Sequence, residues 1–309
     1  MGIIGLIKGF FIAVFVLMLV SAVPMFIMTN SIKATLLQPS FYSTQLESMN
    51  AYQKVQVLLL DMFTDQVDAN SLSMIGATKT ELRTALATAI TKDWVKNEST
   101  RMINSLIWYM TDQTQGVNLS ISIRPKATAG LANLAATKLG ISASDAESII
   151  SASVTGSIPD PFDLSTLMPG IKDNLKQAKS IVGTFMSLSG VLLIAIIVLL
   201  VLIFLFTLDV VKFARTIGWP MLVTGVLLAI ASFLMPGAVA GMLSPMMPSG
   251  SAVTVQTAID FLKPLFNDIL VQSIILVVVS VLLIAFSFVF PMVMKSTDND
   301  GGKRKKLAK

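Results

Sequence analysis

Residues 181–208 read IVGTFMSLSGVLLIAIIVLLVLIFLFTL, an apolar run without a charged side chain. A helix needs about 20 such residues to cross the ~30 Å hydrocarbon core of a bilayer. Three further runs reach that length, at residues 9–28, 217–243 and 273–294. Of the 309 residues, 54% are hydrophobic and 13% are charged, whereas soluble domains carry roughly 25% charged residues. The sequence therefore predicts four transmembrane helices.

The spans leave one long polar stretch, and we expect an all-α membrane protein with a mainly helical external domain between helices one and two. The predicted segments are transmembrane helix 1 at 1–28, the external domain at 29–180, transmembrane helices 2 and 3 at 181–208 and 217–243, an external loop with an amphipathic helix at 244–272, transmembrane helix 4 at 273–294 and a basic tail at 295–309.

The distribution of charge predicts the orientation in the membrane. The two termini and the turn at 209–216 together hold nine basic and three acidic residues, a net +6. Residues 29–180 hold 13 basic and 13 acidic residues, and the loop at 244–272 has a net charge of −1. Lys and Arg are retained on the cytoplasmic side. We therefore expect a multi-pass protein of the plasma membrane with both termini cytoplasmic and residues 29–180 outside. The net charge of the whole chain is +5. Because this excess reflects the topology, we expect no nucleic-acid partner.

The first span has two interpretations. Lys8, the apolar run and the small residues Val20-Ser21-Ala22 are compatible with a cleaved signal peptide. The run continues to Met28, however, and is longer than the usual signal core. We favour an uncleaved signal anchor.

The chain contains neither cysteine nor histidine. Thiolate clusters, typical zinc sites and Ser-His or Cys-His nucleophile pairs are therefore excluded within it. No other catalytic constellation is recognisable, so the sequence predicts a non-enzymatic protein with no catalytic, metal-binding or cofactor-binding residues and no cofactor.

Several helices are predicted in the external domain. Tyr52, Val55, Leu58, Leu59, Met62 and Phe63 share the face of a core-facing helix. Thr78 and Glu81 have the spacing of a capping box, and so do Ser144 and Glu147. A third stripe runs from Val95 to Met110, and a fourth ends at Gly140, a left-handed cap. Residues 118–124 alternate in polarity and predict a short strand or extended linker, and 156–169 predict a loop.

One helix is predicted to run from Ile171 into the second span, joining the domain rigidly to the bilayer. The loop at 244–272 contains an apolar face between Val255 and Leu270, and Pro264 should kink this helix. We favour packing of that face on the protein itself over binding to the membrane surface or to a partner.

Three groups of residues are candidate functional features. Small-xxx-small pairs at Gly237 and Gly241 and at Gly5 and Gly9 are candidates for close helix packing, within the chain or with a partner. Lys303, Arg304, Lys305 and Lys306 are candidates for contact with lipid headgroups, although they also orient the last span. Asn97 and Asn118 begin glycosylation tripeptides, and both fall in the domain expected outside.

Residues 35–42, TLLQPSFY, follow the first span, and the charged helix from Ile171 to Lys179 leads into the second. In these features and in its layout the chain resembles a group of uncharacterised prokaryotic four-span membrane proteins with a helical external domain between spans one and two. The resemblance implies this architecture and no activity or site residues.

The leading hypothesis is a non-enzymatic envelope membrane protein whose external domain binds a protein partner or assembles with its own copies. An accessory or pore-forming subunit of a transporter is the alternative, and a lipid-handling protein is a third. In each case the membrane lipid is a partner.

Overall fold

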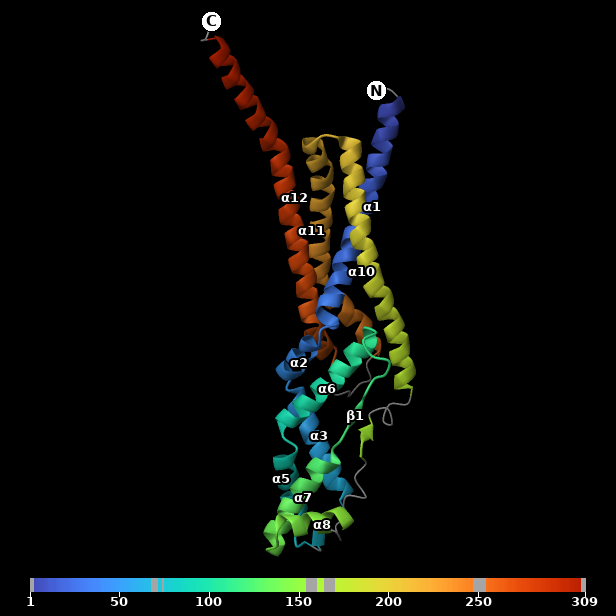
Figure 1. Cartoon of the computed structure of the whole chain (residues 1–309), viewed down its shortest axis with the longest axis vertical. Coiled ribbons are helices and arrows are strands. Elements are labelled where there is room, and N and C mark those ends of the chain that lie inside the picture. The colour runs from blue at the N-terminus through green and yellow to red at the C-terminus, as the bar shows by residue number, and fades with distance from the viewer. Residues whose placement is uncertain are drawn as a thin grey trace. The chain divides into compact units, whose positions relative to one another are not determined.

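The computed structural model describes the backbone of residues 3–67, 72–73, 75–153, 160–163, 170–246 and 254–306, with side chains described between Leu6 and Met292. These residues are almost entirely helical (Figure 1). The chain divides into two compact units, described here one at a time. Unit 1 comprises Met1–Leu36 and Thr184–Lys309, and unit 2 comprises Leu37–Gly183.

Unit 1 is built from the four long apolar helices. They are α1 (Ile3–Leu36), the larger part of α10 (Ile171–Thr207), α11 (Val210–Leu243) and α12 (Val255–Lys306), with the 3-10 turn η2 (Ser244–Met246) after α11. Each is long and apolar enough to cross a membrane. The prediction of a mainly helical protein with four helices long and apolar enough to cross a membrane is thus confirmed.

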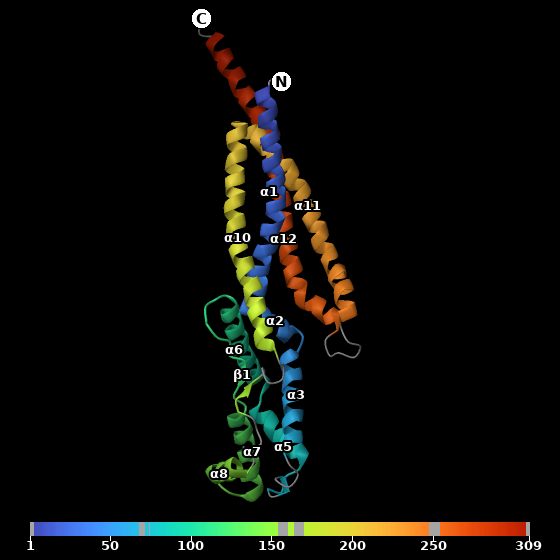
Figure 2. The ribbon, with the colours of Figure 1, turned by 90° about the vertical axis from the view of Figure 1, so that its right-hand side faces the viewer.

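Helices α11 and α12 form an antiparallel hairpin (Figure 2). Small residues recur every seven positions along both helices. A Cβ atom at Gly225 would lie 2.8 Å from Val277 Cγ2 and 3.3 Å from the Ser273 carbonyl oxygen. One at Gly218 would lie 2.8 Å from Ile284 Cγ1 and 3.4 Å from the Ser280 oxygen. A seven-residue repeat keeps one seam facing the partner helix, and small residues let the two backbones approach.

The serines of this seam do not leave polar groups unsatisfied in the apolar interior. Ser273, Ser280 and Ser287 are fully buried. Their hydroxyls donate to carbonyls of their own helix, those of Ile269, Leu276 and Ile284, over 2.6–2.7 Å. Serine therefore acts here as a small residue whose hydroxyl finds its hydrogen-bond acceptor within its own helix.

Larger side chains attach α1 and α10 to the hairpin. Leu19 of α1 and Ile203 of α10 are buried against Ile217 and Met221 of α11. The ring of Phe206 lies 5.6 Å from that of Phe15 on α1. At the other end of the unit, Ile27 clusters with Leu228, Leu265 and Ile269. The apolar face of residues 255–270 is thus partly packed on the protein itself, as favoured from the sequence.

Unit 2 is a helical domain with its own core. Its elements are α2 (Pro39–Ser48), α3 (Ala51–Gln66), α5 (Lys79–Ala89), α6 (Lys92–Met110), β1 (Ser120–Ile121), α7 (Arg124–Leu139), α8 (Ala143–Ser153), β2 (Phe162–Asp163) and the start of α10. The strands pair antiparallel, Ser120 with Asp163 and Ile121 with Phe162. The largest of its fully buried side chains are Tyr52, Phe63, Leu82, Leu86, Ile90, Ile123, Leu131 and Ile150.

The local signals at helix ends are confirmed in two places. Thr78 and Glu81 form the predicted capping box, which starts α5. Gly140 follows α7 with φ +67°, in the left-handed region that favours glycine. The second predicted box, at Ser144 and Glu147, is wrong. Ser142 caps α8 instead, accepting a hydrogen bond from the Asp145 amide, because the helix begins at Ala143 and already contains Ser144.

The predicted core face of α3 is partly wrong. Val55 and Leu58 are 40% and 68% exposed, whereas Leu60 is only 5% exposed. The helix turns the face of Tyr52, Leu60 and Phe63 to the core, because it packs between α5 and α6. Apolar residues lie on both sides of this helix, so their spacing alone could not choose the face.

Two boundaries differ from the sequence expectation. Helix α1 continues beyond residue 28 to Leu36, so unit 2 begins at Leu37 rather than at residue 29, and it ends at Gly183. The amphipathic segment and the last span form one helix, α12, with Pro264 and Pro291 inside it. Of the predicted loop at 156–169, residues 156–159 and 164–169 lie outside the described part of the chain.

Candidate functional site

Unit 2 has a groove of about 580 Å³ between α5 and α7. The two helices run antiparallel, so the first turn of α5 lies beside the last turn of α7. Small residues form the floor of the groove, and threonines and charged residues its walls. The lining consists of Thr80, Glu81, Thr84, Ala85, Thr88, Ala89, Thr91, Lys126, Ala129, Gly130, Asn133, Leu134 and Thr137.

The groove exists because the two helices approach each other closely. A Cβ atom at Gly130 would lie 3.1 Å from both the Ala85 carbonyl oxygen and the Ala89 Cβ atom. Larger side chains at this crossing would separate the helices. Helices normally pack 8–10 Å apart, and a pair joined through such small residues leaves a furrow along its outer side.

Three of the five threonines that line the groove donate their hydroxyl protons to carbonyls of their own helix. Thr84 Oγ1 donates to the Thr80 carbonyl over 3.0 Å, and Thr88 Oγ1 to the Thr84 carbonyl over 3.1 Å. On the other wall, Thr137 donates to Asn133 over 2.8 Å. These hydroxyls present methyl groups and acceptor lone pairs to the groove. The walls therefore suit a partner that brings apolar contact and hydrogen-bond donors.

One end of the groove is closed by a charged cluster. Glu81 Oε1 lies 2.6 Å from Lys138 Nζ, and Glu81 Oε2 accepts from the Thr78 amide over 2.9 Å. The hydrogen bond from Lys138, followed by those from the Thr78 amide and hydroxyl, lowers the pKa of the Glu81 carboxyl to about 2. Lys126 lines the opposite end. The groove thus has a pinned, ionised carboxylate at one end and an exposed ammonium at the other.

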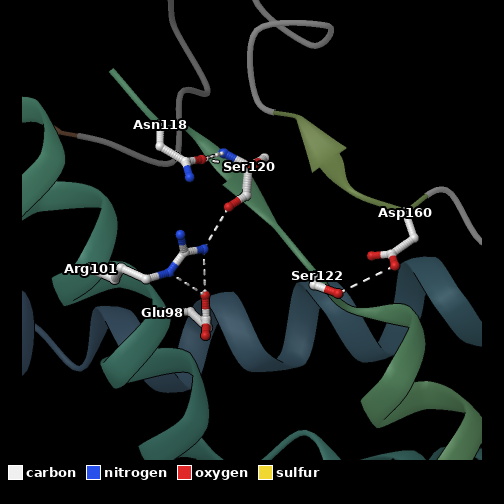
Figure 3. Close-up of polar contacts among 6 residues, drawn as sticks. All are labelled: Glu98, Arg101, Asn118, Ser120, Ser122 and Asp160. Atoms are coloured by element: carbon white, nitrogen blue, oxygen red, sulfur yellow. Dashed lines mark hydrogen bonds and ion pairs between the residues drawn. The ribbon is translucent and has the colours of Figure 1, made fainter. Parts of the chain in front are cut away.

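A second polar cluster joins α6 to the strand pair (Figure 3). Arg101 donates to Glu98 Oε2 over 2.8 Å and to the Ser120 carbonyl over 2.7 Å. Asn118 Oδ1 accepts from the Ser120 amide and hydroxyl over 3.0 and 2.7 Å. Farther along the same segment, Ser122 Oγ donates to Asp160 Oδ2 over 3.3 Å. These bonds hold the extended segment 118–122 in place, which accounts for the cluster as a structural feature.

Asp160 also carries a carboxylate oxygen, Oδ1, that is buried and has no hydrogen-bond partner within the described part of the chain. Among those same residues, no three acidic side chains gather closely enough to hold a metal ion. A single buried oxygen beside one serine hydroxyl does not make a catalytic arrangement, which needs a second group to accept or supply a proton.

The structure places the candidate glycines away from helix contacts within the chain. A Cβ atom at Gly9, Gly237 or Gly241 would meet no atom within 4 Å, and the surroundings of Gly5 lie outside the described residues. The close approach of helices occurs instead at Gly218 and Gly225. Contact of the candidate glycines with another protein chain remains a prediction.

The remaining candidates are placed as follows. Lys303, Arg304, Lys305 and Lys306 form the last described turn of α12, and their side chains lie outside the described part. Asn97 is exposed within α6, and Asn118 is exposed before β1. Lipid contact by the tail and glycosylation of the two asparagines remain predictions.

Sequence reasoning missed both the groove and the seam, although each has a signal. Thr80, Thr84 and Thr88 recur every four residues beside Ala85 and Ala89, a pattern of one helix face without bulky side chains. Gly218, Gly225 and Ser232 recur every seven residues, and Ser273, Ser280 and Ser287 do the same. Neither pattern shows which helix lies opposite.

Comparison with known proteins gives no match. No protein-family model matches the chain, and no curated protein and no solved structure is significantly similar to it.

Proposed function

We propose that this chain is a non-enzymatic integral membrane protein whose unit 2 binds a helix of a protein partner in the groove between α5 and α7. A second copy of the chain is one such partner. The groove itself is the observation that carries the proposal. It has a floor of small residues, three threonine hydroxyls that are left to accept hydrogen bonds, an ion-paired carboxylate at one end and an exposed ammonium at the other.

The membrane context of the proposal comes from charge. The net +6 of the termini and the 209–216 turn, against a net charge of zero for residues 29–180, favours cytoplasmic termini and an extracytoplasmic unit 2 in the plasma membrane. The exposed side chains that line the groove would then face a compartment outside the cell, where a secreted or membrane-bound partner can reach them.

The packing of unit 2 supports a role in recognition. Eighteen of its described hydrophobic residues form one buried cluster shared by its helices, and ion pairs such as those of Lys96 with Glu47 and Arg83 with Asp61 connect neighbouring helices on the surface. A preorganised surface loses little conformational entropy when a partner binds.

The direct experiment fills the groove with a large side chain. Ala129 is exposed in the groove, so Ala129→Trp should block it without disturbing the core. Ser148→Trp on the exposed face of α8 is the matched control. Both full-length variants and the parent would be purified in mild detergent after cross-linking in cells. We expect the parent and Ser148→Trp to be recovered with the same companion or as the same oligomer, and Ala129→Trp without it.

Recovery of the parent chain as a monomer without companions would overturn the proposal. So would equal recovery of the companion by all three proteins. Flux of small solutes through liposomes holding the purified chain alone would favour the transporter-subunit alternative instead. The described residues offer that alternative no particular support, since the buried serines between α11 and α12 are bonded within their own helices.

A further inference from the structure

We propose that unit 1 binds a phospholipid with an amine-containing headgroup in a groove between α11 and the first half of α12. The groove has a volume of about 260 Å³ and is lined from both helices. It lies wholly within unit 1 and is separate from the α5–α7 groove, so this inference does not depend on the proposed function. The only condition that it shares with that function is that the long helices lie in a bilayer.

The position along the helices places the groove at a boundary of the hydrocarbon core. Arg215 is the last charged residue of α11, and Pro236 lines the groove 21 residues later. At 1.5 Å per residue this is about 32 Å, close to the ~30 Å thickness of the hydrocarbon region. Residues of the groove that precede Pro236 on α11 are therefore at the depth of acyl chains, and those near Pro236 are at the depth of headgroups.

The charged residues of the lining lie at the matching end of the groove. Ser232 and Phe233 of α11 and Phe266, Asn267 and Leu270 of α12 line the half that lies deeper in the bilayer, which carries no charge. Gln256, Ile259, Asp260 and Lys263 line the groove toward the start of α12. A ligand with a hydrocarbon chain and a charged head fits this gradient in one orientation only, with its head beside Asp260 and Lys263.

The two charges are available for a headgroup. Within the described part of the chain, Lys263 makes no ion pair, and it is exposed. Asp260 Oδ1 accepts from Gln256 Nε2 over 3.0 Å, which fixes the carboxylate and leaves its other oxygen for a donor. An ammonium near the membrane surface attracts phosphate, and a carboxylate attracts an amine. Together they match a headgroup that carries both.

Two prolines add acceptors to the same groove. Pro236 and Pro264 have no N–H, so the carbonyls of Ser232 and Asp260 receive no hydrogen bond from the residue four positions later. Both Ser232 and Asp260 line the groove. Of the two, the Asp260 carbonyl lies in the headgroup half of the groove, where the amine of the headgroup can donate a hydrogen bond to it.

The test is native mass spectrometry of the full-length chain, released from detergent after addition of one lipid at a time. The lipids are phosphatidylethanolamine, phosphatidylglycerol and diacylglycerol with identical acyl chains. The variants are Lys263→Gln and Asp260→Asn, at exposed positions where folding should be preserved. The control is Lys54→Gln, which makes the same change in charge at an exposed lysine of unit 2.

We expect the parent to retain phosphatidylethanolamine best. Lys263→Gln should reduce retention of both phospholipids about fivefold, the effect of one lysine near a headgroup, and leave diacylglycerol unchanged. Asp260→Asn should reduce retention of phosphatidylethanolamine but not of phosphatidylglycerol. The inference would be overturned if Lys263→Gln retained the phospholipids like the parent, if Lys54→Gln lost as much, or if the parent bound none of the three lipids.

Discussion

Lys138 at the end of α7 donates a hydrogen bond of 2.6 Å to Glu81 in the first turn of α5. The same Glu81 carboxylate accepts from the Thr78 amide and so caps α5. One carboxylate therefore both starts a helix and fastens it to its neighbour. Because these two helices form the α5–α7 groove, this contact also fixes the shape of that groove.

The first prediction concerns the acid stability of unit 2. The pKa of Glu81 is lowered to about 2 by Lys138 and Thr78, from an ordinary value of 4.5. A lowered pKa means that the folded state favours the ionised carboxylate. The stabilisation is therefore present above pH 4.5 and is lost as the pH falls toward 2. We expect Glu81→Gln to destabilise unit 2 at pH 7 and to reduce the loss of stability between pH 4.5 and 2.

Urea unfolding of the full chain in detergent would measure this effect, followed by the fluorescence of Trp94 and Trp108 of unit 2 in a chain whose third tryptophan carries the change Trp219→Phe. Glu147→Gln on the exposed face of α8 serves as the control and should behave like the parent. Parallel pH profiles for Glu81→Gln and the parent would contradict the assignment.

The second prediction separates the two sets of glycines on α11. Gly225→Ala places a methyl group 2.8 Å from Val277 Cγ2 and 3.2 Å from the Val277 amide nitrogen, so the helices must move apart. We expect a loss of about 1–3 kcal/mol, the usual effect of overpacking. Gly237→Ala meets open space and should leave the monomer unaffected.

Thermal unfolding in micelles, followed by circular dichroism, compares these two variants directly. A change of oligomeric state in Gly237→Ala without a change in monomer stability would show that this glycine packs against another chain, as the small-xxx-small spacing predicts. Equal stability of Gly225→Ala and the parent would be incompatible with the close α11–α12 contact.

The third prediction concerns the polar contact between α1 and α12. Gln272 Nε2 donates to Ser31 Oγ over 3.0 Å and to Asp268 Oδ2 over 2.8 Å, and Ser31 is fully buried. Removing the Ser31 hydroxyl should cost about 0.6–1 kcal/mol, as for interhelical hydrogen bonds in other membrane proteins. Ser21→Ala on the same helix removes only a bond to its own backbone. Unfolding measurements should show this loss of stability for Ser31→Ala and almost none for Ser21→Ala. A larger loss for Ser21→Ala than for Ser31→Ala would refute a stabilising role of the Gln272–Ser31 contact.

The sequence was sufficient for those features that depend on local chemistry. The four spans follow from apolar runs such as 181–208, because hydrocarbon leaves few alternatives for a backbone. The cap at Thr78 and the left-handed Gly140 depend only on neighbouring residues, and both are confirmed.

Features that depend on tertiary contacts were not predictable in this way. Gly218 and Gly237 are equally small, and only the position of α12 distinguishes them. The α5–α7 groove requires that Gly130 lie against Ala85 and Ala89, residues about 40 positions earlier. The exposed Leu58 and buried Leu60 differ because of the helices beside α3, which a periodic pattern does not identify.

The central claim is that unit 2 lies outside a membrane whose inner side holds both termini. The chain has no cysteine, so single cysteines can report their side of the membrane without a background signal. We would introduce Ser148→Cys on the exposed face of α8 and, in a separate protein, Lys309→Cys at the end of the chain, and treat intact cells with a membrane-impermeant maleimide. We predict that Ser148→Cys is labelled in intact cells and that Lys309→Cys is labelled only after the cells are permeabilised. Labelling of Lys309→Cys in intact cells, with Ser148→Cys protected until permeabilisation, would contradict the account.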